Sequence, residues 1–430
     1  MKNLIKLLTL CAFAGFLFTA CEGPMGLPGK DANETCKLCH NPTSVDAKVT
    51  EFELSKHGYG EAAFEEAGST GCGPCHLSEA FKFVVANNTP VAFTIVAPAT
   101  TYSNPYATST SKAYGEINCF ACHKNLHTSF TDADYYPLTN TAAVPMTMYG
   151  GTKTINLTQD GGKSNLCVKC HQPRPFTNSN TNKNVLNYDS LKTFPTVVFY
   201  DAARTDGKVN LLKPGYRTHT HYGTAGAVYA GKGGIEFGTG YTNSWHTTGA
   251  SCQDCHMAEI TGKAGGHTFV AKGNFNGCNV TGCHSTAAIT STSTTKWSTP
   301  RAQVKTLLDQ LAAKLKVGTV EIMNRNPDAE ANLWVTLTNN KYDGYLNIYD
   351  PINNPDGLTN NPTGTFKATS TTGFSAAQIT TNNTLPVITL TNAQMGAIIN
   401  FQLCLRDYSL GIHNTAYTVT LLTNSLAILP

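Results

Sequence analysis

Five copies of the pattern Cys-x-x-Cys-His constrain this chain more than any other feature of its sequence. They use ten of its fifteen cysteines: Cys36 and Cys39, Cys72 and Cys75, Cys119 and Cys122, Cys167 and Cys170, and Cys252 and Cys255. The histidines that end the copies are His40, His76, His123, His171 and His256. A disulfide framework would not need a histidine after each pair, and a zinc ribbon joins one Cys-x-x-Cys to another. Scattered copies that each carry a histidine are typical of c-type haem attachment.

The spacing fits that chemistry. Two thiols add to the two vinyl groups of one haem, and two intervening residues let both sulfurs reach the ring. The histidine that follows then lies beneath the iron and supplies its proximal ligand. We therefore expect a mainly irregular chain with short α-helices at the attachment motifs, in which a stack of haems provides much of the apolar core.

A sixth motif departs from this spacing. Cys278 and Cys283 are separated by four residues, and His284 follows directly. A Cys-x4-Cys-His variant is a known attachment pattern in which the extra residues bulge outward, whereas the alternative is a disulfide between the two cysteines. The adjacent histidine and five neighbours of the same kind favour attachment, so we predict six c-type haems.

Seven of the thirteen histidines lie outside the motifs: His57, His127, His219, His221, His246, His267 and His413. Seven free histidines are enough to supply a second ligand to six irons, and methionines that could replace them are few. Ligation by two histidines throughout is the economical hypothesis, and it leaves no iron position for substrate. His219 and His221 are two residues apart, and we predict that His219 is the spare.

From about residue 216 onward the chain resembles bacterial multihaem cytochromes of the lipoprotein, extracellular-electron-transfer type. The resemblance is carried by four segments around histidines, His-Tyr-Gly, Asn-Ser-Trp-His-Thr, Gly-Gly-His-Thr-Phe and Gly-Ile-His-Asn. In such proteins these histidines are distal haem ligands, which implies that role for His221, His246, His267 and His413. Functions vary within such families, so the resemblance implies electron transfer and not one reaction.

The N-terminus has the pattern of an export signal. Two lysines precede a short apolar stretch that ends at Cys21, and small residues before this cysteine indicate lipoprotein processing. Ordinary signal cleavage nearby is the alternative. We expect a signal peptide at 1–20, a lipid-anchored tether with three collagen-like Gly-X-Y triplets at 21–34, and an outer-membrane, cell-surface or periplasmic location.

The remaining chain divides into a six-haem region at 35–298 and a C-terminal region at 299–430 that closes the haem core. Leucines at helical spacing after Pro300 predict a helix with Thr299 as its cap, and further helices are predicted at Ala393–Asp407 and Asn414–Ser425. Strand-like runs lie between 318 and 390. The leftover Cys404 stands in an apolar stretch and is predicted to be a buried, inert thiol.

The leading functional hypothesis is an electron carrier whose partners are other redox proteins or an extracellular electron acceptor. A net charge of +3 gives no support for a nucleic-acid partner. One alternative is a reductase of a small nitrogen or sulfur oxyanion, which needs an iron with an open distal position. Another is a subunit of a polymeric cytochrome wire, in which a histidine ligates the haem of a neighbouring molecule.

Overall fold

A computed structural model gives the fold. It describes residues 40–41, 43–58, 72–86, 117–124, 128–129, 132–149, 151–174, 176, 186–204, 206–208, 210, 212–215, 218–318, 320–325, 342–347 and 388–430. The described chain is mostly irregular with short helices and a few two-stranded sheets, as predicted. None of the helices in these ranges is long and apolar enough to cross a membrane.

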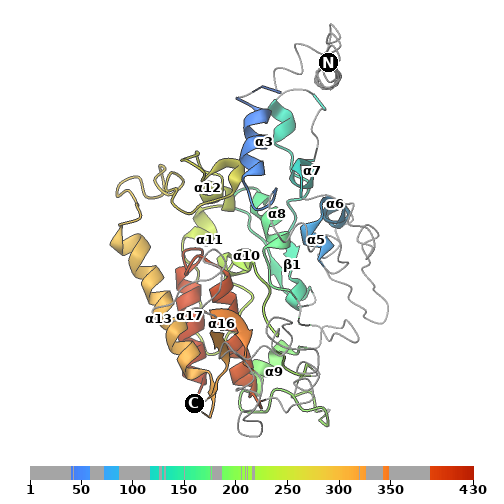
Figure 1. Cartoon of the computed structure of the whole chain (residues 1–430), viewed down its shortest axis with the longest axis vertical. Helices are drawn as coiled ribbons and strands as arrows, with labels where there is room; N and C mark the ends of the chain where they lie inside the picture. The colour runs from blue at the N-terminus through green and yellow to red at the C-terminus, as the bar shows by residue number, and fades with distance from the viewer. Residues whose placement is uncertain are drawn as a thin grey trace, which may run out of the picture.

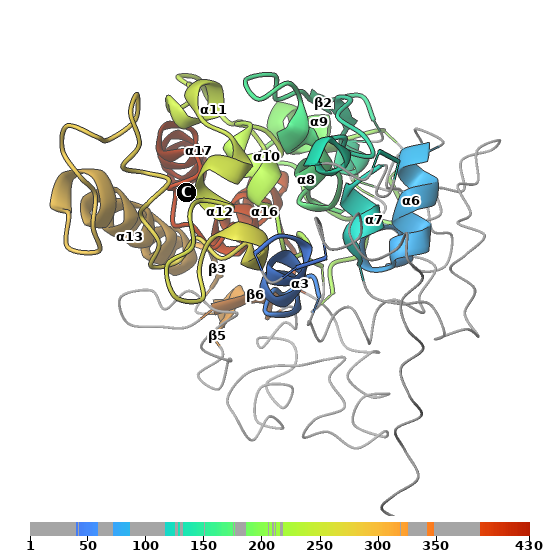
Figure 2. The ribbon, with the colours of Figure 1, turned by 90° about the horizontal axis from the view of Figure 1, so that it is seen from above.

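The N-terminal two thirds carries short elements separated by turns (Figure 1). The α-helices are α3 (Val45–Glu53), α5 (Gly73–His76), α6 (Ser78–Ala86), α7 (Cys119–Cys122), α8 (Lys163–Cys170), α9 (Tyr188–Thr193), α10 (Ala225–Tyr229), α11 (His246–Gly249) and α12 (Cys252–His256). The other helical turns are η1 (Asp132–Tyr135), η2 (Thr147–Tyr149), η3 (Gly266–Thr268) and the π-turn η4 (Thr294–Ser298). Figure 2 shows α3 beside α12, and α3 packs on η3, so a segment near the N-terminus reaches the segment that contains His267.

Three antiparallel pairs of strands complete the described elements. They are β1 (Val144–Pro145) with β2 (Thr154–Ile155), β3 (Lys316–Val317) with β4 (Val320–Glu321), and β5 (Met323–Arg325) with β6 (Tyr342–Leu346). Strands β4, β5 and β6 lie within the stretch 318–390, where the sequence has strand-like runs, and much of that stretch is outside the described residues.

The C-terminal region contains three longer helices that pack together at one end of the molecule (Figure 1): α13 (Thr299–Lys314), α16 (Asn392–Arg406) and α17 (Thr415–Ile428). The prediction for α16 is confirmed to within one residue at each end, and Thr391 and Gln394 form a capping box at its start. The prediction of Thr299 as a cap is wrong. The π-turn η4 runs directly into α13, so Thr299 is already helical and the preceding Ser298 makes no side-chain cap.

Two buried asparagines fasten these helices to the irregular segment that contains His246. Asn400 on α16 accepts from the backbone N–H of Ile235 at 2.7 Å and donates to its carbonyl at 2.8 Å. Asn414, which caps α17, accepts from the N–H of Ser244 at 2.9 Å. Each bond satisfies backbone groups that would otherwise be buried without a partner, so the C-terminal helices fix the path of this segment.

The packing of α13 on α17 gives a test of the fold. Leu311 on α13 is fully buried, whereas its neighbour Gln310 is exposed. We expect Leu311→Ala to lower the free energy of unfolding by about 2–5 kcal/mol, because it leaves a cavity in the core. Gln310→Ala, the control, should stay within about 0.5 kcal/mol of the parent. Denaturant unfolding followed by far-UV circular dichroism measures both, and equal effects would contradict this packing.

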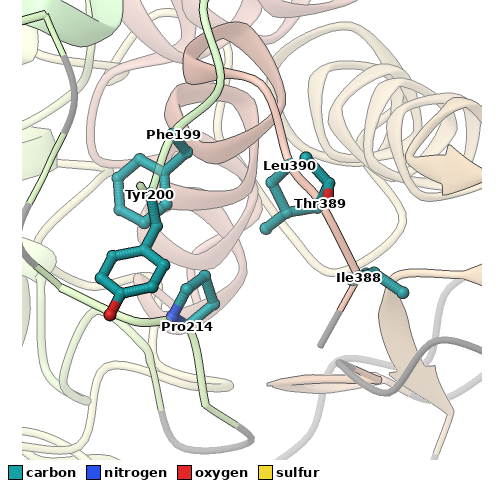
Figure 3. Close-up of a pocket in the computed structure, with 6 residues that line it drawn as sticks. All are labelled: Phe199, Tyr200, Pro214, Ile388, Thr389 and Leu390. Atoms are coloured by element: carbon teal, nitrogen blue, oxygen red, sulfur yellow. The ribbon is translucent and has the colours of Figure 1, made fainter. Parts of the chain in front are cut away.

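A small hollow of about 100 Å³ lies where Phe199 and Tyr200 approach the segment before α16 (Figure 3). Phe199 donates its N–H to the carbonyl of Leu390 at 2.7 Å, and these two residues line the hollow with Pro214 and Ile388. None of the predicted site residues lines it, so we regard it as a packing feature.

Candidate haem-binding site

Four of the attachment motifs lie on short helical turns, α5, α7, α8 and α12. A helical turn brings residues three apart onto one face, so the two cysteines of each motif share a side. Two of these turns have side-chain caps. Asn118 accepts from the N–H of Phe120 at 3.1 Å, and Ser251 and Asp254 form a capping box at the start of α12.

The sixth motif closes in the same way as the shorter ones. In three of the regular motifs the histidine N–H donates to the carbonyl of the first cysteine, at 3.1 Å for His76, 2.8 Å for His123 and 3.0 Å for His171. His284 makes the equivalent bond to the carbonyl of Cys278 at 3.0 Å, although two more residues intervene. Gly282, with a φ of +86°, lies within the added turn. The two extra residues are therefore accommodated without loss of the backbone hydrogen bond between the histidine and the first cysteine.

Five motif histidines each face one of the other histidines. The pairs, with their ring-centre separations, are His171 with His57 (6.0 Å), His76 with His221 (6.4 Å), His123 with His267 (6.2 Å), His284 with His246 (6.2 Å) and His256 with His413 (6.0 Å). Four of the five partners come from segments more than one hundred residues away in the sequence. The pairs therefore join parts of the chain that lie far apart in the sequence.

The separations suit one metal ion between each pair of rings. A metal–imidazole bond is about 2.0 Å long and the bonding nitrogen lies about 1.1 Å from its ring centre, so two rings on one ion have centres about 6.2 Å apart. Direct contacts between aromatic rings also have centres about 4.5–7 Å apart, and what distinguishes these five pairs is that each joins a motif histidine to a histidine outside the motifs. The histidine pairs therefore fit an iron with two axial imidazoles.

The pairs fall into two classes by the angle between their rings. The planes are steeply inclined in three pairs, at 72° for His57 and His171, 77° for His76 and His221, and 86° for His246 and His284. They are closer to parallel in the other two, at 29° for His123 and His267 and 28° for His256 and His413. The angle between axial ligand planes affects the electronic structure of an iron, so the five candidate centres are not equivalent.

Burial keeps most of these histidines neutral, which is the form that binds metal. Burial and the neighbouring His57 lower the pKa of His171 to about 3, and burial and Arg174 lower the pKa of His221 to about 2. The pKa values of His57, His123, His256, His267 and His284 are also lowered, in each case mainly by burial.

His413 is the exception. Burial acts to lower its pKa, but the carboxylate of Asp407 outweighs burial and raises it. Nδ1 of His413 lies 2.5 Å from Oδ1 of Asp407, whose side chain is 1 % exposed. Tyr408 and Leu410, with φ of 59° and 53°, hold the intervening turn in the left-handed region that such residues rarely adopt. Strain of this kind persists where the surrounding structure enforces it.

Two other histidines direct Nδ1 at backbone carbonyls. His256 Nδ1 lies 2.8 Å from the carbonyl oxygen of Phe269, and His246 Nδ1 lies 3.1 Å from that of Ile412. A proton held on Nδ1 by such an acceptor leaves the lone pair on Nε2 for a metal. These acceptors therefore orient the rings for ligation.

The cysteines bring neighbouring motifs together. The thiols of Cys75 and Cys170, of Cys167 and Cys252, and of Cys255 and Cys278 lie close enough to shift each other's pKa. In space, motif two thus adjoins motif four, four adjoins five, and five adjoins six. Motif three also reaches motif four, because Cys122 and Cys170 pack against one apolar cluster of Phe81, Val85, Ala121 and Leu166.

His219 has different surroundings from the five paired partners. Its Nδ1 lies 3.0 Å from the carbonyl oxygen of Thr220 and also contacts the Arg406 guanidinium. Its ring meets that of Tyr345 edge to face, with centres 5.0 Å apart. His221, two residues on, is the one that faces a motif histidine. That His219 is the spare stays a prediction.

Some predicted residues lie outside the described ranges: Cys21, Cys36, Cys39 and His127. His40 is described, and it is not part of the five pairs. Cys404 is buried on α16, and burial raises the pKa of its thiol, as expected for an inert group.

Sequence reasoning missed three residues that contact candidate ligands: Asp407, Phe269 and Glu51. Glu51 accepts from the backbone N–H of His267 at 2.8 Å. The segment around Phe269 carries a weak signal, since two glycines precede His267. Asp407 lies six residues before His413 and has no local pattern that marks it. Comparison of the chain with protein-family models, curated proteins and solved structures found no match.

Proposed function

We propose that the chain binds six c-type haems, each with two axial histidines, and transfers electrons among them outside the cytoplasm. One observation carries this proposal: five motif histidines each face a second histidine at 6.0–6.4 Å between ring centres. The haems, when bound, would supply the one-electron chemistry, and the protein would supply ligands, spacing and surroundings.

The protein's own residues account for several requirements of such a carrier. Buried imidazoles remain neutral and therefore able to ligate, and acceptors at Nδ1 hold three of them in orientation. An iron with two axial histidines keeps nearly the same coordination geometry when it gains or loses an electron. Such a centre is therefore suited to electron transfer, and it has no open position for substrate. The thiol contacts between motifs two, four, five and six support close packing of the centres.

The two alternatives receive less support. A reductase needs an iron with an open distal position, yet five motif histidines already face a second histidine. A polymeric wire needs a histidine from another molecule, and these five pairs form within one chain. The lipid anchor at Cys21 and the export signal remain part of the proposal, and they would hold the protein at a membrane surface near other redox proteins or an extracellular acceptor.

The haem content and iron spin state test the proposal. We expect intact mass spectrometry of the mature protein, produced in a host that attaches c-type haems, to find six covalent haems. The ferric optical and paramagnetic spectra should be low-spin throughout. The double variant Cys278→Ser/Cys283→Ser should lose one haem and keep five, which separates attachment at the sixth motif from a disulfide there. Fewer than six haems in the parent protein, or a stoichiometric high-spin signal, would contradict the proposal.

A further inference from the structure

Phe269 contacts three histidines that belong to three different pairs. Its ring meets the ring of His57 edge to face, with centres 4.8 Å apart, and that of His267 with centres 5.9 Å apart. Its carbonyl oxygen lies 2.8 Å from Nδ1 of His256. The partners of these histidines are His171, His123 and His413, so one residue touches the candidate sites of motifs four, three and five.

The backbone at Phe269 is held in an uncommon conformation. Its φ of 55° and ψ of 14° place it in the left-handed region, which is unfavourable for a bulky residue. Bonds around it enforce this conformation: Gly265 N–H donates to the carbonyl of Val270 at 2.9 Å, and Thr268 Oγ1 donates to that of Gly265 at 2.6 Å. With this backbone, the carbonyl reaches one histidine pair while the ring reaches two others.

Ordinary core packing accounts poorly for this residue. Phe269 is half-buried, and the apolar clusters of the described residues do not include it. Its ring contacts are edge-to-face contacts with imidazoles, at 75° to His57 and 69° to His267. Such contacts have a preferred geometry and therefore resist rotation of the imidazole rings.

We infer that Phe269 is a positioning residue shared by three haem centres: its ring sets the planes of His57 and His267, and its carbonyl sets the tautomer of His256. The inference rests on the proposed function. His57 belongs to a steeply inclined pair and His267 to a nearly parallel one, so loss of the ring disturbs one centre of each class. His256 keeps its carbonyl acceptor when only the side chain is removed.

Electron paramagnetic resonance of the ferric full-length holoprotein tests the inference. The angle between two axial imidazole planes sets the splitting of the iron d orbitals, so steeply inclined and nearly parallel pairs give distinct low-spin signals. Phe269→Gly removes the ring, keeps the carbonyl and relieves the backbone. We expect six haems, no high-spin iron, and a shift of two low-spin signals, one from each class. The control Phe275→Ala, which removes a half-buried ring that packs on Trp297 at 5.0 Å between centres, should leave all signals unchanged.

A Phe269→Gly protein with six haems and the parent spectrum would overturn the inference. If this variant does not accumulate, Phe269→Tyr and Phe269→Leu test the role of the ring instead. The tyrosine ring should preserve the parent spectrum, whereas leucine should shift the same two signals, and a parent spectrum from the leucine variant would overturn the inference. Failure of the proposed function is distinguishable, because the parent protein itself would then lack haems or contain high-spin iron.

Discussion

On the proposed function, replacing His221 by alanine should convert one of the six low-spin irons to high spin, whereas His219→Ala should leave all six low-spin. The ring of His221 faces that of His76, while His219 Nδ1 faces the Thr220 carbonyl and Arg406. Removal of a distal imidazole opens one position on the iron, which either binds water or stays empty. The ligand field is then weaker, and a weaker ligand field favours high spin. Ferric optical and paramagnetic spectra, with the haem content measured by mass, quantify both variants.

Added imidazole provides a control for this pair of variants. It should enter the space left by His221→Ala and return the sixth iron to low spin, which separates loss of a ligand from general damage to the fold. The prediction fails if the two variants give the same spectrum, or if His219→Ala is the one that produces high-spin iron.

Replacing Asp407 by asparagine should raise the reduction potential of one centre. The buried carboxylate accepts from Nδ1 of His413, which makes the imidazole a stronger donor and favours ferric iron. An amide oxygen is a weaker, uncharged acceptor. A tenfold change in the preference of the site for ferric over ferrous iron corresponds to about 60 mV for a one-electron couple, and we expect a shift of this order. Spectroelectrochemical titration of the holoprotein measures this shift.

Asp189→Asn is the matched control for that experiment. It makes the same change of charge at an exposed position on α9, so a long-range effect of charge would appear in both variants. We expect its titration curve to superimpose on that of the parent. An Asp407→Asn curve without a shifted component would contradict the role given to the carboxylate.

The sequence was informative wherever the chemistry is local. Each attachment motif could be read from five consecutive residues, or seven for the sixth, and the short helices at four motifs follow from this spacing. His221 could be singled out from its neighbour His219 because only His221 is in a segment typical of ligands, and its ring faces that of His76. The helix over Asn392–Arg406 was predictable because its capping residues and apolar content lie within the helix itself.

Pairing of the histidines could not be predicted, because it depends on how distant segments pack. His57 lies between motifs one and two in the sequence, yet it faces the histidine of motif four. The contacts of Asp407 depend on a turn with left-handed residues that carry large side chains, and those of Phe269 depend on the same kind of backbone. Propensity disfavours these conformations, so only tertiary structure reveals them.

The position of His413, 157 residues after His256, affects the order in which the histidine pairs can form. On the proposed function, export delivers the N-terminus first, and His246 and His284 emerge only 38 residues apart, so their centre can be completed early. His256 instead waits for almost the whole remaining chain before His413 emerges. A protein truncated before His413 would carry all six motifs and still lack the histidine that faces His256.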